Sequence, residues 1–341
     1  MSNKITEKFF TQADFSRREK EVLTEVTQET GFQVEREIFR GFIYDRNKVG
    51  SLIYRGTWQG KAAVLKLQGL RPEVDEEKMI RHFDAQNQSQ LVRVPELYTH
   101  FSWNEKRGYG YLITEYIDAP KIYQIPFATS AQMQDFAHFY QEYRTSALTR
   151  SWLEPETLDS LAFTIKRVNH WRKISESKKI LKPKDYLPYL KRFTDLAEKH
   201  LKTVKMVFCH GHLTANDVFK LADGRFVILS NLLWSYRPEC YDLAFNLWAC
   251  TKDIRDLNYT FKDLLGYVGK WLSVYRQIPV VKKDKDFERK MATAMLERCI
   301  GVIVVDLVAT EFYQQQKNAK YLYHLLGLHQ NLFDHFACHL E

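Results

Sequence analysis

The stretch VFCHGHLTANDVFKLADGRFVILSNLLWSYRPECYDLAF, which runs from Val207 to Phe245, decides the fold of this chain. Its pattern predicts an apolar strand, a polar loop, two more short apolar strands joined by a turn, and then a helix. Because the loop HGHLTAND follows a strand directly, its side chains predict a polar functional site. The loop has a carboxylate only at its far end, Asp217, so it is either an active site or the scaffold of one.

The chain before this stretch is rich in strands. SLIYRGTW and KAAVLKLQ are joined by Gln59-Gly60, a hairpin turn signal, and VPELYTHFSWN and YLITEYID read as two further antiparallel strands. Helices are expected at 11–29 and in EEKMIRHF, where Met79, Ile80 and Phe83 have helical spacing.

After Asp118 the pattern is mostly helical. Strands with one main helix first, and helices afterwards, predict an α+β chain in two lobes. We place the N-terminal lobe at residues 1–117 and the C-terminal lobe at 118–341, with a hinge near 115–120.

The bulk composition is that of an ordinary globular protein, with 341 residues, 45% hydrophobic and 14% aromatic. The N-terminus has no apolar stretch of a signal peptide, and the longest apolar run, CIGVIVV, is too short to span a bilayer. Five scattered cysteines follow no disulfide framework, which is typical of a reducing compartment. We therefore expect a cytoplasmic protein without a transmembrane segment.

The net charge of +8 is concentrated in residues 161–205, which hold 13 Lys and Arg against 4 Asp and Glu. One explanation is a surface for an anionic partner, such as nucleic acid, a phosphorylated metabolite or an acidic lipid. The other is a set of solvated helix faces whose lysine stems cover apolar surface. The sequence leaves both explanations open.

In order and spacing, these segments resemble the protein-kinase-like superfamily, in particular its aminoglycoside phosphotransferase and choline kinase branch. IYRGTWQGKAAVLKL resembles the second and third strands, with Lys66 in the place of the nucleotide-phosphate lysine. EKMIRHF resembles the helix that presents a partner glutamate, and helical phase favours Glu77 over Glu76. YLITEYID resembles the strand that leads to the interlobe hinge, with Thr114 guarding the pocket.

The resemblance implies a binding cleft between the lobes for ATP or another nucleotide, or for a small-molecule ligand. Lys66, Glu77, Glu115 and Ile117 would bind the cofactor. It also implies structural roles for His210 and for Asp242 of the YDLA sequence, which would brace the catalytic loop.

The departures from the family pattern fall in one place. His212 stands where the family has its catalytic Asp, and Asp217 where it has a metal-binding Asn. Ser230, twelve residues before Asp242, stands at the position of the main metal-binding Asp. Because Mg²⁺ usually requires one or two carboxylates, the neutral Ser230 is a poor substitute, and Asp217 would have to hold any metal.

Three functions are compatible with this pattern. The first is a pseudokinase that keeps its cleft for ligand binding or as a scaffold. The second is an active small-molecule phosphotransferase with altered catalytic groups, since an imidazole such as that of His212 can accept a proton. The third is an interaction module that binds an anionic partner through residues 161–205.

Overall fold

The computed structural model describes residues 15–43, 48–69, 75–148, 150–252, 254, 256–309 and 319–341. The chain divides into two compact units. The first consists of Met1–Gln86, Arg93–Ala119 and Val227–Leu232, and the second of Asn87–Val92, Pro120–Phe226 and Leu233–Glu341. The lobes expected from the sequence, 1–117 and 118–341, place Asn87–Val92 in the N-terminal lobe and Val227–Leu232 in the C-terminal lobe, whereas the structure assigns each to the other unit.

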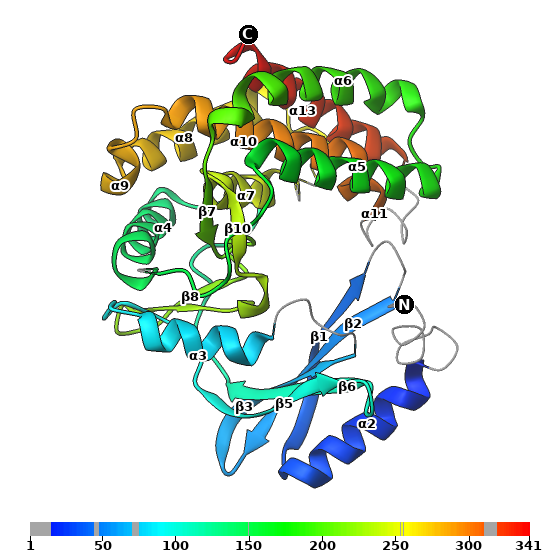
Figure 1. Ribbon diagram of the computed structural model, residues 1–341, viewed down its shortest axis with the longest axis vertical. Helices are drawn as coiled ribbons and strands as arrows, with labels where there is room; N and C mark the ends of the chain where they lie inside the picture. Colours follow the sequence, from blue (N-terminus) through cyan, green and yellow to red (C-terminus); the bar gives the residue numbers. More distant parts are fainter. Residues whose placement is uncertain are drawn as a thin grey trace. The chain divides into compact units, whose positions relative to one another are not determined.

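The first unit is built on a five-stranded antiparallel sheet with the order β1-β2-β3-β6-β5 (Figure 1). The strands are β1 (Gln33–Ile43), β2 (Lys48–Trp58), β3 (Lys61–Gln68), β5 (Leu97–Asn104) and β6 (Tyr109–Glu115). The expected hairpin between β2 and β3 is present, and both of its turn residues, Gln59 and Gly60, have positive φ angles of 48° and 77°. Such angles are those of the turns that match the twist of a hairpin.

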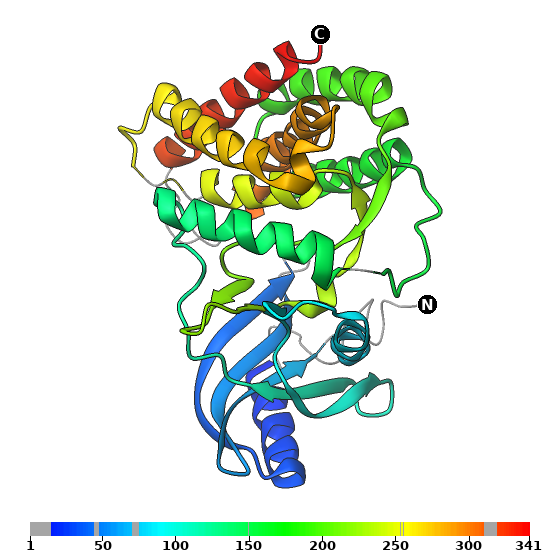
Figure 2. The same ribbon diagram turned by 90° about the vertical axis from the view of Figure 1, so that its left-hand side faces the viewer.

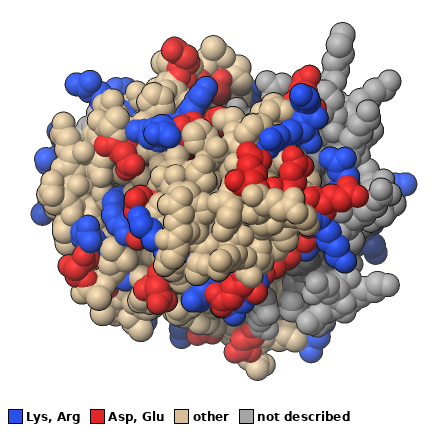
Figure 3. All heavy atoms as spheres, turned by 90° about the horizontal axis from the view of Figure 1, so that it is seen from below, with Lys and Arg blue, Asp and Glu red and all other residues tan. Residues whose placement is uncertain are grey.

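One helix covers this sheet and completes its core. Of the helix expected at 11–29, the described part is α2 (Phe15–Thr30), and the first four expected residues lie outside the described ranges. Val22 and Val26 of α2 are buried against the sheet residues Leu52, Leu65 and Ile113. Two ion pairs, Arg40–Glu19 and Arg107–Glu29, connect α2 to the strand residue Arg40 and to Arg107. Figure 3 shows Lys and Arg interspersed with Asp and Glu on the face seen from below.

The main helix of the first unit is α3 (Glu76–Gln86). Met79, Ile80 and Phe83, the residues at helical spacing in the sequence, are all buried. The helix therefore faces the protein interior with the apolar side that its sequence predicts.

The second unit is mainly helical (Figures 1 and 2). Its helices are α4 (Ser130–Glu142), α5 (Ser160–Lys178), α6 (Pro183–His200), α7 (Tyr241–Thr251), α8 (Phe261–Gln277), α9 (Pro279–Lys282), α10 (Phe287–Gly301), α11 (Leu307–Ala309) and α13 (Ala319–Cys338). Helix α10 packs against α5, α6, α7 and α13. No helix in the described ranges is long and apolar enough to cross a membrane.

The remaining strands are short. β7 (Met206–Cys209) and β10 (Ser235–Pro238) form an antiparallel pair, while β4 (Val92–Arg93), β9 (Phe226–Ile228) and β8 (Val218–Lys220) form a sheet in that order. The polar loop HGHLTAND, residues 210–217, connects β7 to β8. Its neighbours in space are set by the β7–β10 pair and by the start of α7.

Gly56 of β2 is required by a close approach of the chain to itself. A Cβ atom at this position would lie 2.0 Å from the carbonyl oxygen of Gln33 and 2.8 Å from the ring of Phe32. We expect Gly56→Ala to lower the free energy of unfolding by about 1–3 kcal/mol, because the backbone of β1 would have to move. Urea unfolding followed by circular dichroism measures this loss.

The matched control is Gly266→Ala in α8, where no atom lies within 4 Å of an added Cβ. This change should be neutral or should stabilise the protein by up to about 1 kcal/mol, since alanine favours the helix. Equal losses in the two variants would contradict the packing described for β1 and β2.

Candidate functional site

Lys66 lies on β3, and its ammonium group is held by a carboxylate of α3. The Lys66 Nζ to Glu76 Oε2 distance is 2.5 Å, and the two side chains are only 14% and 8% exposed. The expected pairing of Lys66 with Glu77 is therefore wrong, because Glu76 is the partner. The position of the Lys66 ammonium group therefore depends on the first turn of α3.

Glu77 points elsewhere for a geometric reason. Successive residues of an α-helix are rotated by about 100°, so two adjacent carboxylates cannot face the same strand. Glu77 forms an ion pair with Arg81 one turn later and lies 3.6 Å from His100 Nε2 on β5. The helical phase read from the sequence favoured Glu77 over Glu76 because the exact start of α3 could not be predicted.

The end of β6 carries the residues expected at a hinge. Glu115 accepts two hydrogen bonds from Arg93, at 2.6 and 2.8 Å, so its carboxylate is occupied within the first unit. Ile117 is buried, and none of the hydrogen bonds among the described residues uses its backbone N–H. A buried backbone N–H normally has a partner, so this group is available to a ligand or to water.

Ser230 also belongs to the first unit and follows β9. It is half-buried and has a positive φ of 57°, which is uncommon for a residue with a side chain. Its hydroxyl takes part in none of the hydrogen bonds found among the described residues. As a neutral oxygen, it contributes no charge toward a metal ion.

In the second unit, the loop after β7 turns sharply at Gly211, whose φ is +73°. A Cβ atom there would lie 2.7 Å from Ser235 Oγ and 2.8 Å from the carbonyl oxygen of Leu233. Only glycine combines this left-handed conformation with such close neighbours. The glycine of the HGH sequence is thus needed to bring the loop against β10.

The buried carboxylate of Asp242 holds the same turn through hydrogen bonds. Asp242, in the first turn of α7, is 3% exposed; its Oδ1 accepts from the Gly211 N–H at 3.1 Å and its Oδ2 from the Tyr143 hydroxyl at 2.8 Å. The Tyr143 hydroxyl in turn accepts from the His210 N–H at 2.8 Å. Two consecutive loop amides are therefore tied to Asp242, one directly and one through Tyr143.

His212, which the family resemblance aligned with the catalytic base, contacts the acidic residue of the loop, Asp217. Its Nδ1 lies 3.1 Å from Asp217 Oδ2, and 42% of its side chain is exposed. The same Asp217 oxygen accepts from the Thr214 N–H at 3.0 Å and from the Thr214 hydroxyl at 2.7 Å. Asp217 itself is 2% exposed, so its carboxylate braces the loop from inside.

The contacts of Asp217 bear on whether the loop can bind a metal ion. Mg²⁺ needs oxygen ligands with open access and usually keeps several waters. The Oδ2 atom of Asp217 already has three partners within the loop, and the described residues contain no group of three or more His, Cys, Asp or Glu side chains that would hold a metal ion. The Oδ2 atom of Asp217 is thus engaged within the loop, where it also orients His212.

Sequence reasoning missed Thr214 and Tyr143. The spacing of Thr214 and Asp217, three residues apart, is that of a local turn in which a hydroxyl and a carboxylate bond each other and the backbone, and this signal is readable. Tyr143 is 67 residues from His210 in the sequence, so no local pattern indicates their contact.

The basic segment 161–205 contains two kinds of side chain. Arg167 pairs with Glu297 and Arg192 with Asp334 and Glu341. Nine lysines of the segment are exposed: 166, 173, 179, 182, 184, 191, 199, 202 and 205. The concentration of charge in the sequence thus combines solvated lysines with arginines that pack against the protein.

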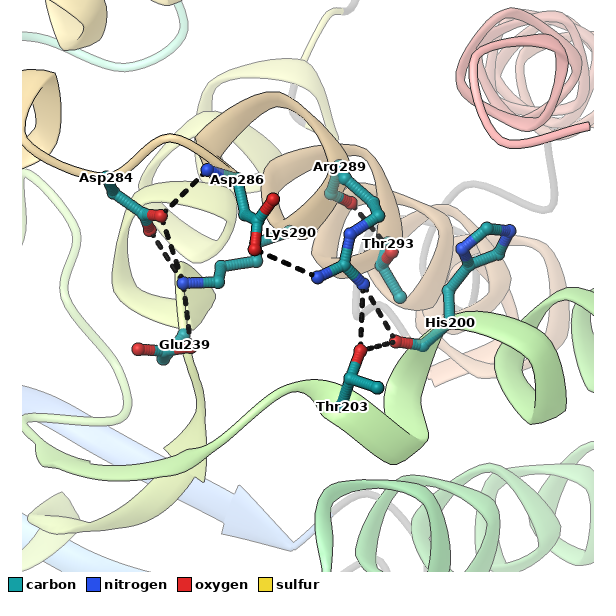
Figure 4. Close-up of polar contacts among 8 residues, drawn as sticks. All are labelled: His200, Thr203, Glu239, Asp284, Asp286, Arg289, Lys290 and Thr293. Atoms are coloured by element: carbon teal, nitrogen blue, oxygen red, sulfur yellow. Dashed lines mark hydrogen bonds and ion pairs between the residues drawn. The ribbon is translucent and has the colours of Figure 1, made fainter.

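A cavity of about 310 Å³ in the second unit is lined in part by Asp242. Of the site residues predicted from the sequence, only Asp242 lines it. Figure 4 shows Lys290 of its wall held between Asp284 and Glu239, at 2.9 and 3.0 Å. This lysine is already neutralised by two carboxylates, so it does not mark the cavity as an anion site.

The buried bonds of Asp242 predict a specific loss of stability. Asp242→Ala should lower the free energy of unfolding by about 1–3 kcal/mol or more, because the Gly211 N–H and the Tyr143 hydroxyl lose their acceptor. Thermal unfolding measures the loss, and hydrogen exchange at the Gly211 amide should become faster. The control Asp195→Ala, at an exposed position of α6, should stay within about 0.5 kcal/mol of wild type. Equal stability of both variants would contradict the bracing role.

The chain matches no protein-family model and no curated protein, but it is similar to solved structures. One is a thermostable mutant of aminoglycoside phosphotransferase APH(4)-Ia with ADP and hygromycin B, at 10% identity and a TM-score of 0.60, covering 91% of this chain and 97% of that one. Another is amicoumacin kinase hAmiN with AMP-PNP, Ca²⁺ and Ami, at 13% identity, a TM-score of 0.60, and 95% and 96% coverage. A third is spectinomycin phosphotransferase APH(9)-Ia with ADP and spectinomycin, at 13% identity, a TM-score of 0.56, and 93% and 97% coverage.

These likenesses extend over almost the whole chain and agree with the sheet and helices of the two units. At such low identities they establish the fold and leave the activity to the residues. The chain has the α+β, protein-kinase-like fold of the aminoglycoside phosphotransferases.

Proposed function

We propose that this chain is a pseudokinase: it binds a nucleotide through its first unit and has lost Mg²⁺-assisted phosphoryl transfer. Lys66 would contact the phosphates, and the backbone of Glu115 and Ile117 would contact the base. His212 and Asp217 would form a structural pair in the loop of the second unit, without a metal.

The bonding of Asp217 carries this proposal. Phosphoryl transfer depends on positioning and on cations that neutralise the phosphates, with a group that orients or deprotonates the acceptor. In this loop the Asp217 carboxylate is buried and already accepts from Thr214 twice and contacts His212. Withdrawing it toward a metal would leave the Thr214 N–H and hydroxyl unpaired, at a cost of about 1–3 kcal/mol for each buried group.

Nucleotide binding is supported by groups in the first unit. The Lys66–Glu76 ion pair keeps an ammonium group in a fixed position, and the buried Ile117 N–H has no described protein partner. The similar solved structures include complexes with ADP and AMP-PNP. A contact between Lys66 and the phosphates of a nucleotide would require no carboxylate in the catalytic loop.

A second candidate is an active phosphotransferase in which His212 is the general base. The specific observation in its favour is the His212 Nδ1 to Asp217 Oδ2 contact of 3.1 Å, since a buried carboxylate that orients an imidazole is a recurrent catalytic arrangement. The remaining ring nitrogen would then accept a proton from an acceptor hydroxyl. The similar structures that contain hygromycin B and spectinomycin are of phosphotransferases.

Nucleotide binding should be independent of Mg²⁺ and should depend on Lys66. A ligand that binds only the folded state raises its stability by RT ln(1 + [L]/Kd), about 2.7 kcal/mol at 100 times Kd. We expect ATP to raise the melting temperature of wild type equally with and without Mg²⁺, and not to raise that of Lys66→Met. Thermal-shift titration measures both.

The control is Lys61→Met, which removes an exposed lysine from the same strand. This variant should retain the full ATP-induced shift. Because Lys66→Met leaves Glu76 buried without its partner, the comparison uses the ligand-induced shift of each variant and not its absolute melting temperature. A shift that is unchanged in Lys66→Met would refute the nucleotide site.

Turnover distinguishes the two candidates. Under the pseudokinase proposal, purified protein should consume ATP in the presence of Mg²⁺ no faster than His212→Ala does. Coupled assay of ADP release, with a range of hydroxyl acceptors, is the measurement. Mg²⁺-dependent turnover that disappears in both His212→Ala and Asp217→Asn would instead establish the second candidate.

A further inference from the structure

Three arginines from separate elements of the second unit converge on one tyrosine. Arg167 of α5, Arg237 of β10 and Arg298 of α10 have their guanidinium carbons 4.8, 5.5 and 5.1 Å from the centre of the Tyr241 ring. We call these three residues the arginine cluster. Tyr241 is the first residue of α7, and Figure 1 shows where α5, α7, α10 and β10 lie.

The carboxylates near the cluster compensate it incompletely. Glu297, 3% exposed, forms ion pairs with Arg167 and Arg298, the latter at 3.1 Å. Asp306 also faces Arg298, and its Oδ2 accepts from Trp248 Nε1 at 2.9 Å. Arg237 takes part in no ion pair or hydrogen bond among the described residues. Three guanidinium groups thus face two carboxylates, and Arg237 has neither of them as a partner.

Several buried donors of the cluster are also unsatisfied. The Nε atoms of Arg167, Arg237 and Arg298 are all buried without a hydrogen-bond partner in the described part of the chain. Contacts with the faces of Phe163 and Tyr241 attract the positive charge but do not accept these N–H groups. A buried charged donor without an acceptor costs free energy, so the cluster is incomplete as a purely structural feature.

The surroundings strengthen this conclusion. Burial lowers the pKa of Arg167, and the positive charges of Arg298 and Arg237 lower it further, against the raising effect of Glu297 and Tyr241. An added anion would offset both the burial and the repulsion. The ion pairs of Arg167 and Arg298 with Glu297 compensate part of this charge, and they do not include Arg237.

The cluster lies beside the polar loop, and two of its three side chains are partly exposed. A Cβ atom on Gly211 would be 3.4 Å from Arg237 Nε. The centre of the Phe245 ring is 5.4 Å from the Arg298 guanidinium carbon and 4.7 Å from the centre of the His212 ring. Arg237 is partly exposed, and the Arg167 side chain retains 15% exposure. A molecule held by the cluster would therefore lie close to His212.

We propose that the arginine cluster binds the phosphate group of a small molecule. Guanidinium groups bind oxyanions through paired N–H donors, and they do so more specifically than lysine. A phosphate monoester is favoured over a carboxylate because it has three acceptor oxygens and about 1.5 to 2 negative charges. The inference rests on the second unit alone, so it is independent of nucleotide binding at Lys66.

Calorimetric titration at constant ionic strength tests this site, with inorganic phosphate, phenyl phosphate and benzoate as probes. We expect wild type to bind both phosphates saturably and benzoate more weakly. Arg237→Gln should weaken phosphate binding roughly tenfold or more, which is about 1.4 kcal/mol. Arg237→Lys should recover it only in part, because lysine lacks the planar fork.

The matched control is Lys166→Gln, which removes one positive charge from an exposed position of α5 next to Arg167. It should bind phosphate as wild type does. Absence of phosphate binding in wild type, equal affinities of wild type and Arg237→Gln, an equal loss in Lys166→Gln, or binding of benzoate alone would each overturn the proposal. Turnover or ATP binding enters none of these outcomes, so they are separable from the proposed function.

A second measurement needs no variant and remains decisive if Arg237→Gln does not fold. Wild-type protein is labelled with phenylglyoxal, an arginine reagent, and the modified residues are identified by mass spectrometry. Phenyl phosphate should protect Arg237 from labelling, while chloride at the same ionic strength should not. Labelling of Arg237 at the same rate in both solutions would refute the phosphate site.

Discussion

The buried carboxylate of Asp242 is the constraint on which the polar loop of the second unit depends. It accepts from the Gly211 N–H directly and holds the Tyr143 hydroxyl, which accepts from the His210 N–H. Without these acceptors, consecutive backbone donors would be buried unpaired, which proteins rarely tolerate. The left-handed Gly211 then allows the chain to pass close to β10. None of these interactions involves the residues at the catalytic positions, so the scaffold can persist when the chemistry changes.

At the positions that the family resemblance marks as catalytic, this chain has His212 and Asp217, which lie 3.1 Å apart. Asp217 turns inward and binds Thr214 and His212, so that one carboxylate serves the internal structure of the loop. The charge that neutralises phosphates in a kinase would have to come from elsewhere. Beside the same loop lies the arginine cluster, which has more positive than negative groups. Under the two proposals made above, the second unit would bind an anion at the arginine cluster and would use Asp217 within the loop.

Much of the fold could be predicted from the sequence because its signals are local. The Gln59-Gly60 hairpin, the buried face of α3 and the strand before HGHLTAND follow from turn chemistry and periodicity over a few residues. The choice between Glu76 and Glu77 failed because one residue of uncertainty in the start of a helix rotates every side chain by about 100°. That uncertainty is smaller than the resolution of any pattern in a single sequence.

Other features could not be predicted because they join distant parts of the chain. Arg167, Arg237 and Arg298 come from three elements that meet only around Tyr241, and the sequence counts Arg167 simply as one more charge of a basic segment. The sequence also did not indicate that Asn87–Val92 belongs to the second unit and Val227–Leu232 to the first. The spacing of Thr214 and Asp217 is a local pattern that can be read from the sequence. That both Thr214 donors bond the same Asp217 oxygen could be seen only from the distances in the structure.

A crystal structure of the protein grown with AMP-PNP and Mg²⁺ tests the pseudokinase proposal most directly. We expect nucleotide phosphates at Lys66, with the Asp217 carboxylate still bonded to Thr214 and His212 and no metal ion on it. A Mg²⁺ ion at about 2.0–2.1 Å from an Asp217 oxygen, with the Thr214 bonds broken, would contradict it.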